Sequence, residues 1–303
     1  MDNVCHTLVG AAFGEAGLKR QTRFGNATLM IAANLPDVDV LVFAVDIPSV
    51  AFRRGWTHGT LAQALLPVAL TAVIWAVSRM FPARGARHPI CVRSLLLLSY
   101  VGVLSHVALD LLNTYGVRLL MPFDRRWFYG DAVFIIDPWL WLALGAGIWL
   151  ARRRGLPGPA RQALVVAALY IATMCVTARL GREVVLDAWR AARGSEPRHL
   201  MVGPVPVTPF RREVIVDAGT HYETGTLEWF PMKVRFDPAV VPKNALHRRV
   251  AQAREATPIR AFLVWSRFPF WTLEATPNGT RVSVGDMRFL GRGRPFVQSV
   301  IVR

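Results

Sequence analysis

Charged residues are scarce in this sequence of 303 residues. Only 18% of the residues are Asp, Glu, Lys or Arg, whereas 53% are hydrophobic, and the mean hydropathy is +0.32. In a soluble globular protein about a quarter of the residues are charged. The shortage of charge therefore argues against an ordinary cytosolic enzyme and indicates residence in a membrane. Disorder is excluded, because aromatic residues and long apolar runs bury ample surface.

Cysteine is scarcer still, and a removable leader is not expected. The three cysteines, Cys5, Cys91 and Cys175, are far apart, which is neither a disulfide framework nor a zinc-finger spacing. The start of the chain is acidic at Asp2, and no cleavage pattern follows the Gly- and Ala-rich stretch that ends at Lys19. A secretory signal peptide begins with a basic segment, so we predict that none is present.

Acidic residues are also few relative to basic ones. The chain has 36 Lys and Arg against 20 Asp and Glu, which gives a net charge of +16. Nucleic-acid binding would require a basic face, but the arginines are scattered between apolar runs. We therefore expect no nucleic-acid partner, and we attribute the excess to cytoplasmic loops and to affinity for the anionic headgroups of membrane lipids.

Six segments in the first 180 residues have the composition of membrane helices. Residues 3–18 form a short helix of small residues, and residues 26–45 form an apolar segment that is broken at Pro36. Proline lacks an amide hydrogen and disfavours helix at the residue before it. The other four are long enough, or nearly so, to cross about 30 Å of hydrocarbon. These predicted full spans are residues 58–78, 93–112, 134–150 and 163–179.

After Arg182 the pattern changes to short alternating runs separated by Gly- and Pro-containing turns, which is typical of strands. In this part only residues 245–255 have helical character. The predicted fold is therefore a polytopic all-α membrane bundle, residues 1–182, followed by a smaller β-rich (α+β) extramembrane domain, residues 183–303.

The loops between the predicted spans differ in charge. Loops 19–25, 79–93 and 151–162 together carry 11 Lys and Arg, whereas loops 46–57 and 113–133 carry five. Cytoplasmic loops of membrane proteins are enriched in Lys and Arg. The sequence therefore predicts that the first set is cytoplasmic and that the C-terminal domain is extracytoplasmic.

Ionisable residues within the apolar part are costly, and they normally face a bundle interior or a wet cavity. His106 and Asp110 share one helix face at positions i and i+4, and Asn113 extends that face. An imidazole and a carboxylate on one face are a common pair of metal ligands. A buried hydrogen bond that merely satisfies both groups is the alternative.

Two further acids, Asp37 and Asp39, follow the helix break at Pro36. The break frees backbone groups and presents both carboxylates, which in an extended segment lie on one side. A turn with solvated carboxylates is the alternative interpretation.

Two histidines stand near helix starts. His6 opens the first helix, and His58 is expected in the first turn of its helix, with Thr57 as a possible N-cap. Because successive helices alternate in direction, every candidate ligand falls at the same membrane face, whichever way the protein is inserted. Independent structural roles have no reason to converge in this way. The predicted metal ligands are His6, Asp37, Asp39, His58, His106 and Asp110.

These motifs taken together resemble the YdjM-like bacterial inner-membrane proteins, which are described as membrane-bound metal-dependent hydrolases. The resemblance covers residues 1–180 and implies a multi-pass protein of the bacterial inner membrane. The motifs that carry it are Met1-Asp2-Asn3 with His6-Thr7, Ala33-Asn34-Leu35-Pro36-Asp37-Val38-Asp39, Arg54-Gly55-Trp56-Thr57-His58, and Ser105-His106 with Asp110-Leu111-Leu112-Asn113-Thr114-Tyr115-Gly116.

A more distant similarity is to zinc-dependent phospholipase C and related nucleases. It implies that His58, His106 and Asp110 hold one zinc ion, and that His6 helps to hold a second. It also implies that Asp37 or Asp39 bridges the two ions, so the catalytic roles are assigned to these acids, with Asp37 as the bridge and Asp39 as an outer ligand or an orienting group. The cofactor is therefore one or two divalent ions, expected to be zinc.

The remaining candidates surround these ligands. The predicted phosphate-binding residues of the substrate site are Arg53, Arg54, Arg125 and Arg126, and the predicted supporting residues are Asn34, Asn113 and Asp137. Asp137 before Pro138 also fits the N-cap of a helix. The sequence predicts a hydrolase of an ester or phosphoester, with a small molecule or a lipid as substrate. A metal or proton transporter and a membrane sensor with a structural metal are the alternatives.

Overall fold

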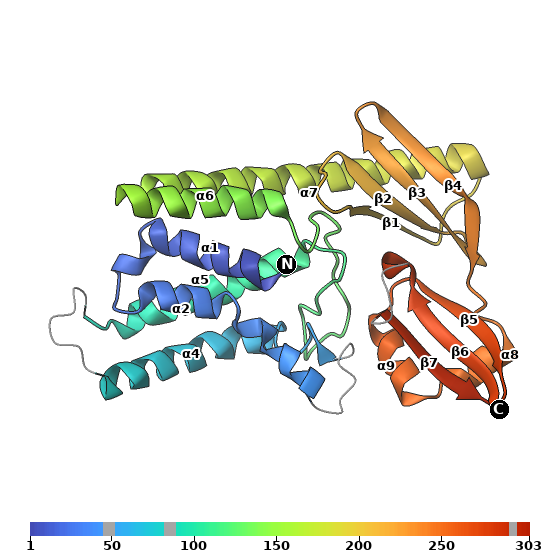
Figure 1. The fold of residues 1–303 in the computed structure, drawn as a ribbon, viewed down its shortest axis with the longest axis horizontal. Helices are drawn as coiled ribbons and strands as arrows, with labels where there is room; N and C mark the ends of the chain where they lie inside the picture. Colours follow the sequence, from blue (N-terminus) through green and yellow to red (C-terminus); the bar gives the residue numbers. More distant parts are fainter. Residues whose placement is uncertain (45–51, 82–88, 291–295) are drawn as a thin grey trace. The chain divides into compact units, whose positions relative to one another are not determined.

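The computed structural model describes residues 1–44, 52–81, 89–290 and 296–303. The chain forms two compact units, of which the first comprises Met1–Leu41 and Arg53–Val176 and the second contains Thr177–Arg303. The first unit is helical and the second carries two sheets (Figure 1). The predicted division at Arg182 lies inside α7 (Gly158–Arg193), a helix that continues from one unit into the other.

The first unit begins with α1, which is capped by Asp2. The Asp2 carboxylate accepts hydrogen bonds from the amides of Val4 and Cys5. The α-helix ends at Ala32, four residues before Pro36, and the chain continues as a 3-10 helix, η2, so the expected extended segment at Asp37 and Asp39 is wrong. The helical elements before α7 are α1 (Asn3–Glu15), η1 (Leu18–Arg20), α2 (Gly25–Ala32), η2 (Leu35–Ala44), α4 (Thr60–Met80), α5 (Val92–Leu111) and α6 (Pro138–Arg154).

Three helices in the described part of the chain are long and apolar enough to cross a membrane, namely Thr60–Met80, Val92–Leu111 and Gly158–Arg193. The prediction of four full spans is therefore wrong. The predicted span 134–150 corresponds to α6, which has only 17 residues and ends in three arginines. At 1.5 Å per residue, a helix of that length falls short of about 30 Å of hydrocarbon.

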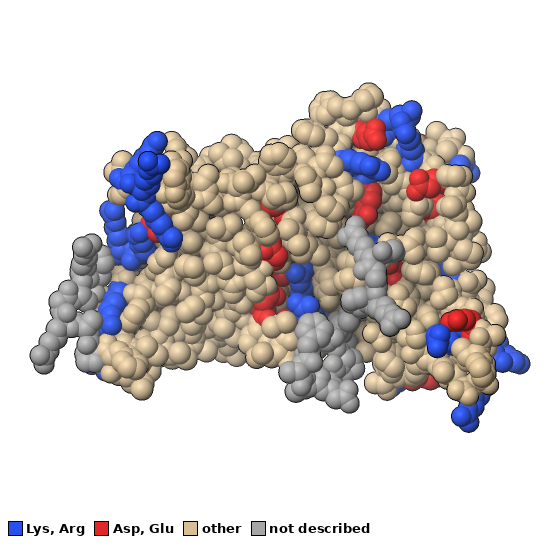
Figure 2. Space-filling model, viewed as in Figure 1, with Lys and Arg blue, Asp and Glu red and all other residues tan. Residues whose placement is uncertain are grey.

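The basic residues of the helix ends gather at one end of the first unit. Lys19, Arg20 and Arg23 line the same surface pocket as Arg152 of α6. Figure 2 shows Lys and Arg side chains clustered at the left end of the helical unit. The first residues of α1 and the last residues of α5 lie at the other end of the bundle (Figure 1).

Close packing of α5 on α2 depends on Gly102. A Cβ atom at this position would lie 2.4 Å from Cβ of Ala32 and 2.9 Å from the backbone nitrogen of Ala33. Glycine therefore permits an approach that any other residue would prevent, one turn before His106.

The second unit contains two antiparallel sheets with strand orders β1-β2-β3-β4 and β5-β6-β7. Trp189 and Val185 of α7 are buried against the first sheet, where they contact residues such as Val214 and Leu227. The strands are β1 (His199–Pro204), β2 (Arg211–Asp217), β3 (His221–Trp229), β4 (Met232–Pro242), β5 (Pro269–Thr276), β6 (Gly279–Asp286) and β7 (Val297–Val302).

The β-rich character of this part is confirmed, but the prediction of one helix is wrong. After α7, the described residues of this unit form two α-helices, α8 (Arg248–Ala253) and α9 (Thr257–Trp265). The missed helix α9 is short and rich in residues of modest helix propensity. Tertiary burial of Ile259, Phe262 and Trp265 stabilises it instead.

The role of Gly102 gives a test of how α5 is positioned. We expect Gly102→Ala to lower the thermal stability of the purified protein, since overpacking costs about 1–3 kcal/mol. The matched control is Gly145→Ala in α6, where an added Cβ meets no atom of the described chain within 4 Å. Because alanine favours helix over glycine, the control should be neutral or stabilising. Equal midpoints of thermal unfolding for the two variants would contradict this packing.

Candidate metal centre

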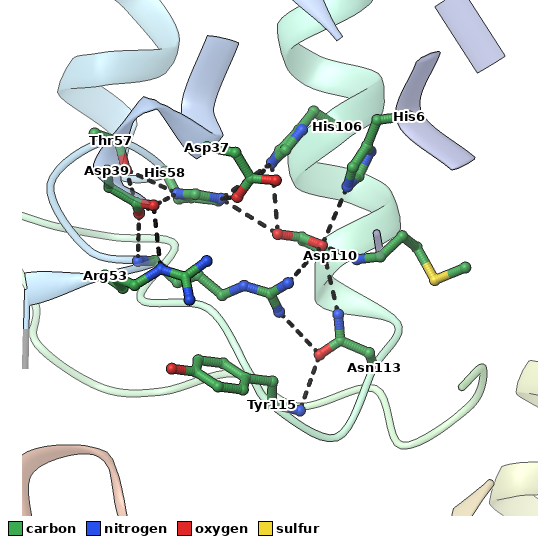
Figure 3. Close-up of polar contacts among 12 residues, drawn as sticks. His6, Asp37, Asp39, Arg53, Thr57, His58, His106, Asp110, Asn113 and Tyr115 are labelled. Carbon is green, nitrogen blue, oxygen red and sulfur yellow. Dashed lines mark hydrogen bonds and ion pairs between the residues drawn. The ribbon is translucent and has the colours of Figure 1, made fainter. Parts of the chain in front are cut away.

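Four buried side chains bring their ligand atoms together at one end of the helical unit (Figure 3). Asp37 comes from η2, His58 from the turn before α4, and His106 and Asp110 from the last two turns of α5. The four atoms all lie within 4.8 Å of one another. Asp37 is 7% exposed and the other three are fully buried.

The distances within this group fit one small cation. The Nε2 atoms of His58 and His106 are 3.1 Å apart. Asp110 Oδ2 lies 3.2 and 3.5 Å from these two nitrogens, and Asp37 Oδ1 lies 3.9 and 3.8 Å from them. Tetrahedral zinc with bonds of about 2.0–2.1 Å separates its ligand atoms by about 3.3 Å.

His106 is held in one tautomer by the backbone. Its Nδ1 lies 2.7 Å from the carbonyl oxygen of Ala33, which accepts but does not donate. The proton of the neutral ring is therefore on Nδ1, and the lone pair of Nε2 faces Asp37 and Asp110.

His58 is oriented by a chain of two hydrogen bonds. Thr57 Oγ1 donates to Asp39 Oδ2 at 2.9 Å, because a carboxylate only accepts. The Thr57 oxygen in turn accepts from His58 Nδ1 at 2.9 Å. The Nε2 atom of His58 therefore also presents a lone pair. Burial lowers the pKa of His58, which keeps the ring neutral and able to bind a metal.

All four converging atoms are thus acceptors. Asp37 Oδ1 and Asp110 Oδ2 are buried and have no hydrogen-bond partner among the described residues. Buried acceptors without a donor are costly, and the two histidine nitrogens are only 3.1 Å apart. A divalent cation would satisfy all four atoms at once, so the residues present fit a metal ion.

The other oxygen of Asp110 faces donors and cations. Oδ1 pairs with the amino group of Met1 and accepts from Arg54 Nη2 at 3.1 Å. The buried guanidinium of Arg54 also donates to Asn113 Oδ1 at 3.1 Å and lies 4.7 Å from the ring centre of Tyr115. Asp110 therefore separates the four-atom group from a fixed positive charge.

His6 lies next to the four-atom group. Its ring stacks on that of His106, with centroids 3.8 Å apart, and its Nε2 is 3.4 Å from Asp110 Oδ1. Burial lowers its pKa to about 3. Within the described chain neither ring nitrogen makes a hydrogen bond.

Among the remaining predicted residues, Asp39 contacts the site indirectly. Besides the Thr57 hydroxyl, it accepts from the amide of Arg54 at 2.8 Å and from Arg53 Nε at 3.4 Å. Asn34 donates to the Thr7 hydroxyl at 2.9 Å. Asp39 thus connects the loop that carries both arginines to the ring of His58.

Three predicted residues have other contacts. Asp137 is the N-cap of α6 and accepts from the hydroxyl of Tyr170 at 2.8 Å. Arg125 is exposed, and Arg126 pairs with Asp124 at the surface. Within the described ranges, none of these contacts reaches the four converging atoms.

The sequence analysis predicts an orienting role for Asp39 but misses two other groups that orient the histidines, the Thr57 hydroxyl and the Ala33 carbonyl. Helix α4 begins at Thr60 with Gly59 as its N-cap, so the predicted N-cap role of Thr57 and the predicted first-turn position of His58 are wrong. The one feature of the sequence that could have indicated the Thr57 contact is that Thr57 directly precedes His58. The Ala33 carbonyl has no signature in a sequence.

Comparison with known proteins identifies the family of the helical unit. A family model described as YdjM inner membrane protein matches residues 1–181, a range that contains every ligand of the group. The chain is also similar to "Uncharacterized protein YfhP" of Bacillus subtilis (strain 168), with 22% identity over 317 residues, 99% of this chain and 90% of that protein. No solved structure matches the chain.

The Thr57 hydroxyl gives a test of how His58 is oriented. We expect Thr57→Val to weaken zinc binding by about 10–100-fold, as is typical when a ligand loses its orienting partner. Thr57→Ser keeps the hydroxyl and should bind as the wild type does. Competition with a chromogenic chelator measures both affinities, and unchanged zinc affinity in Thr57→Val would refute the chain from Asp39 to His58.

Proposed function

The chain belongs to the YdjM family of inner membrane proteins, and from this premise we propose that it is a metal-dependent hydrolase of an ester or phosphoester. Asp37, His58, His106 and Asp110 hold the ion, and zinc suits this set of imidazole and carboxylate ligands. The observation that carries the proposal is the convergence of four buried acceptor atoms.

One ion is the number that the surroundings favour. A second ion next to Asp110 would compete with the guanidinium of Arg54, which already pairs with Asp110 Oδ1 at 3.1 Å. Asp39 accepts from Arg53, Arg54 and Thr57 and therefore acts as an orienting group instead of a bridge. His6 supports the site by stacking on His106.

The ion, Asp37 and Arg53 have different roles in the proposed reaction. A divalent ion held by these residues would supply Lewis acidity, which polarises an ester or phosphoester oxygen. Asp37 is the most exposed of the four ligands, so its carboxylate is the group best placed to take a proton from water. Arg53 is 22% exposed and offers a cation to an anionic substrate.

An apolar groove next to Asp37 supports a lipid substrate. The groove has a volume of about 560 Å³ and is lined by residues of α1, α2 and η2, Asp37 among them. Ile31, Val40 and Leu41 line it and are 48%, 49% and 65% exposed. A headgroup ester at Asp37 would leave its acyl chain along these apolar side chains.

The position of the ligands disfavours the transporter alternative. His58 precedes α4 and Asp110 is the penultimate residue of α5, so the group lies at the ends of these candidate spans. Substrate sites of secondary transporters lie near the bilayer midplane. Since the basic helix ends lie at the opposite end of the bundle, we propose that the metal site and the C-terminal unit face the extracytoplasmic side.

The metal and the chemistry are tested together. Asp37→Asn keeps the shape of the side chain but removes its charge, so we expect metal content to fall and turnover of phosphoesters to drop by about 100-fold or more. Metal is measured by elemental analysis of purified protein. Hydrolysis is measured on two phosphodiesters that differ only in an acyl chain, of which the acylated one should be the better substrate.

The control for this experiment is His199→Ala, an exposed histidine of β1. It should keep metal and activity. Full metal content and normal turnover in Asp37→Asn would rule out the proposed site. Equal turnover of the two substrates would contradict only the proposal of a lipid substrate.

Orientation is tested with a reporter enzyme that is active only outside the cytoplasm. Fused after Arg303, it should be active, because α7 begins at the basic end of the bundle and crosses once. Fused after Arg154, it should be inactive, because α6 leads from the metal-site end of the bundle to its basic end and, as we propose, crosses the membrane as a short span. The reverse pattern would invert the orientation proposed here.

A further inference from the structure

Four apolar side chains stand exposed at one end of the first sheet of the second unit. Val207 and Phe210 belong to the connection between β1 and β2, Phe230 to the turn between β3 and β4, and Met232 to the start of β4. They are 63%, 58%, 81% and 63% exposed, respectively. We call these four residues the apolar tip.

The apolar tip is an ordered structure. The rings of Phe210 and Phe230 pack edge to face with centroids 5.8 Å apart. The amide of Trp229 donates to the carbonyl of Phe210 at 2.9 Å, which ties the two connections together. Val207 has φ = +70°, a region that β-branched residues rarely adopt. Such backbone strain at an exposed apolar residue is typical of functional segments.

Contacts inside the second unit fix the level of the apolar tip along α7. Arg212, next to the tip at the start of β2, donates through Nη2 to Thr177 Oγ1 at 2.9 Å. A Cβ on Gly181 would lie 2.9 Å from Leu227 and 3.4 Å from the ring of Trp229. The tip end of the sheet therefore lies beside residues 177–181 of α7.

The same residues of α7 mark the end of its apolar stretch. Exposed apolar side chains along the helix include Leu169, Val176 and Leu180. Counted from Arg161 at the basic end, about 20 residues at 1.5 Å each cover about 30 Å, which ends near Gly181. The apolar tip thus stands where α7 leaves the hydrocarbon.

We propose that the apolar tip inserts into the surface of the membrane leaflet from which α7 emerges, with lipid as its partner. Exposed Arg211 and Lys233 flank the tip and suit the anionic headgroups there. Aromatic residues next to basic ones are typical of proteins at this depth of a bilayer. The inference depends on α7 spanning the membrane and is independent of the proposed hydrolysis.

Depth-dependent quenching tests this insertion in the full-length protein, in nanodiscs of phosphatidylcholine and phosphatidylglycerol. An environment-sensitive fluorophore is attached at Phe230→Cys, after Cys91→Ser and Cys175→Ser, while Cys5 is buried. Nitroxide-labelled lipids should quench it by about twofold or more, since interfacial insertion reaches about 5–10 Å into the headgroup region. The matched control is Leu246→Cys, 98% exposed and beyond the opposite end of β4, which should stay unquenched.

Two results would overturn the proposal. Equally weak quenching at both sites, with emission typical of water, would mean that the apolar tip is solvated. Blue-shifted emission at Phe230→Cys without quenching by lipid would mean that protein, such as a second copy of the chain, covers the tip.

Discussion

Two neutral imidazoles that direct their lone pairs at each other over 3.1 Å are the constraint on which the site depends. A hydrogen bond at Nδ1 fixes each ring in that state, with the Ala33 carbonyl as partner of His106 and the Thr57 hydroxyl as partner of His58. Two carboxylate oxygens close the group, so a bound cation would relieve the repulsion among these acceptors. The surrounding structure holds these atoms in an arrangement that fits a metal ion.

The fold of the helical unit supplies that rigidity. Gly102 brings α5 against α2, which places the Ala33 carbonyl within reach of His106. The 3-10 helix η2 turns Asp37 toward α5 and leaves Asp39 to the loop that carries Arg54. The buried charge of Arg54 offsets that of Asp110 on the side away from the ligand group. The negatively charged carboxylates are thus stabilised inside an apolar protein by neighbouring groups that the fold holds in fixed positions.

Much of this was predictable because it follows from periodicity. The spacing of His106 and Asp110 fixes a common helix face, and alternation of helix direction predicts that Asp37 and His58 meet them. The orienting contacts are not periodic, since the Thr57 relay depends on the irregular turn before α4 and the Ala33 contact involves only backbone. The arginines of the loops look alike in sequence, yet Arg54 is buried and Arg125 is exposed, a difference that tertiary packing decides. The length of α6 likewise depends on where its arginine-rich end meets water.

Anomalous scattering from crystals of zinc-loaded protein, recorded on both sides of the zinc absorption edge, tests the central claim most directly. The account predicts a single peak between the Nε2 atoms of His58 and His106 and the facing oxygens of Asp37 and Asp110. A peak at another position, or zinc-loaded protein with the two imidazoles hydrogen-bonded to each other and no peak between them, would contradict it.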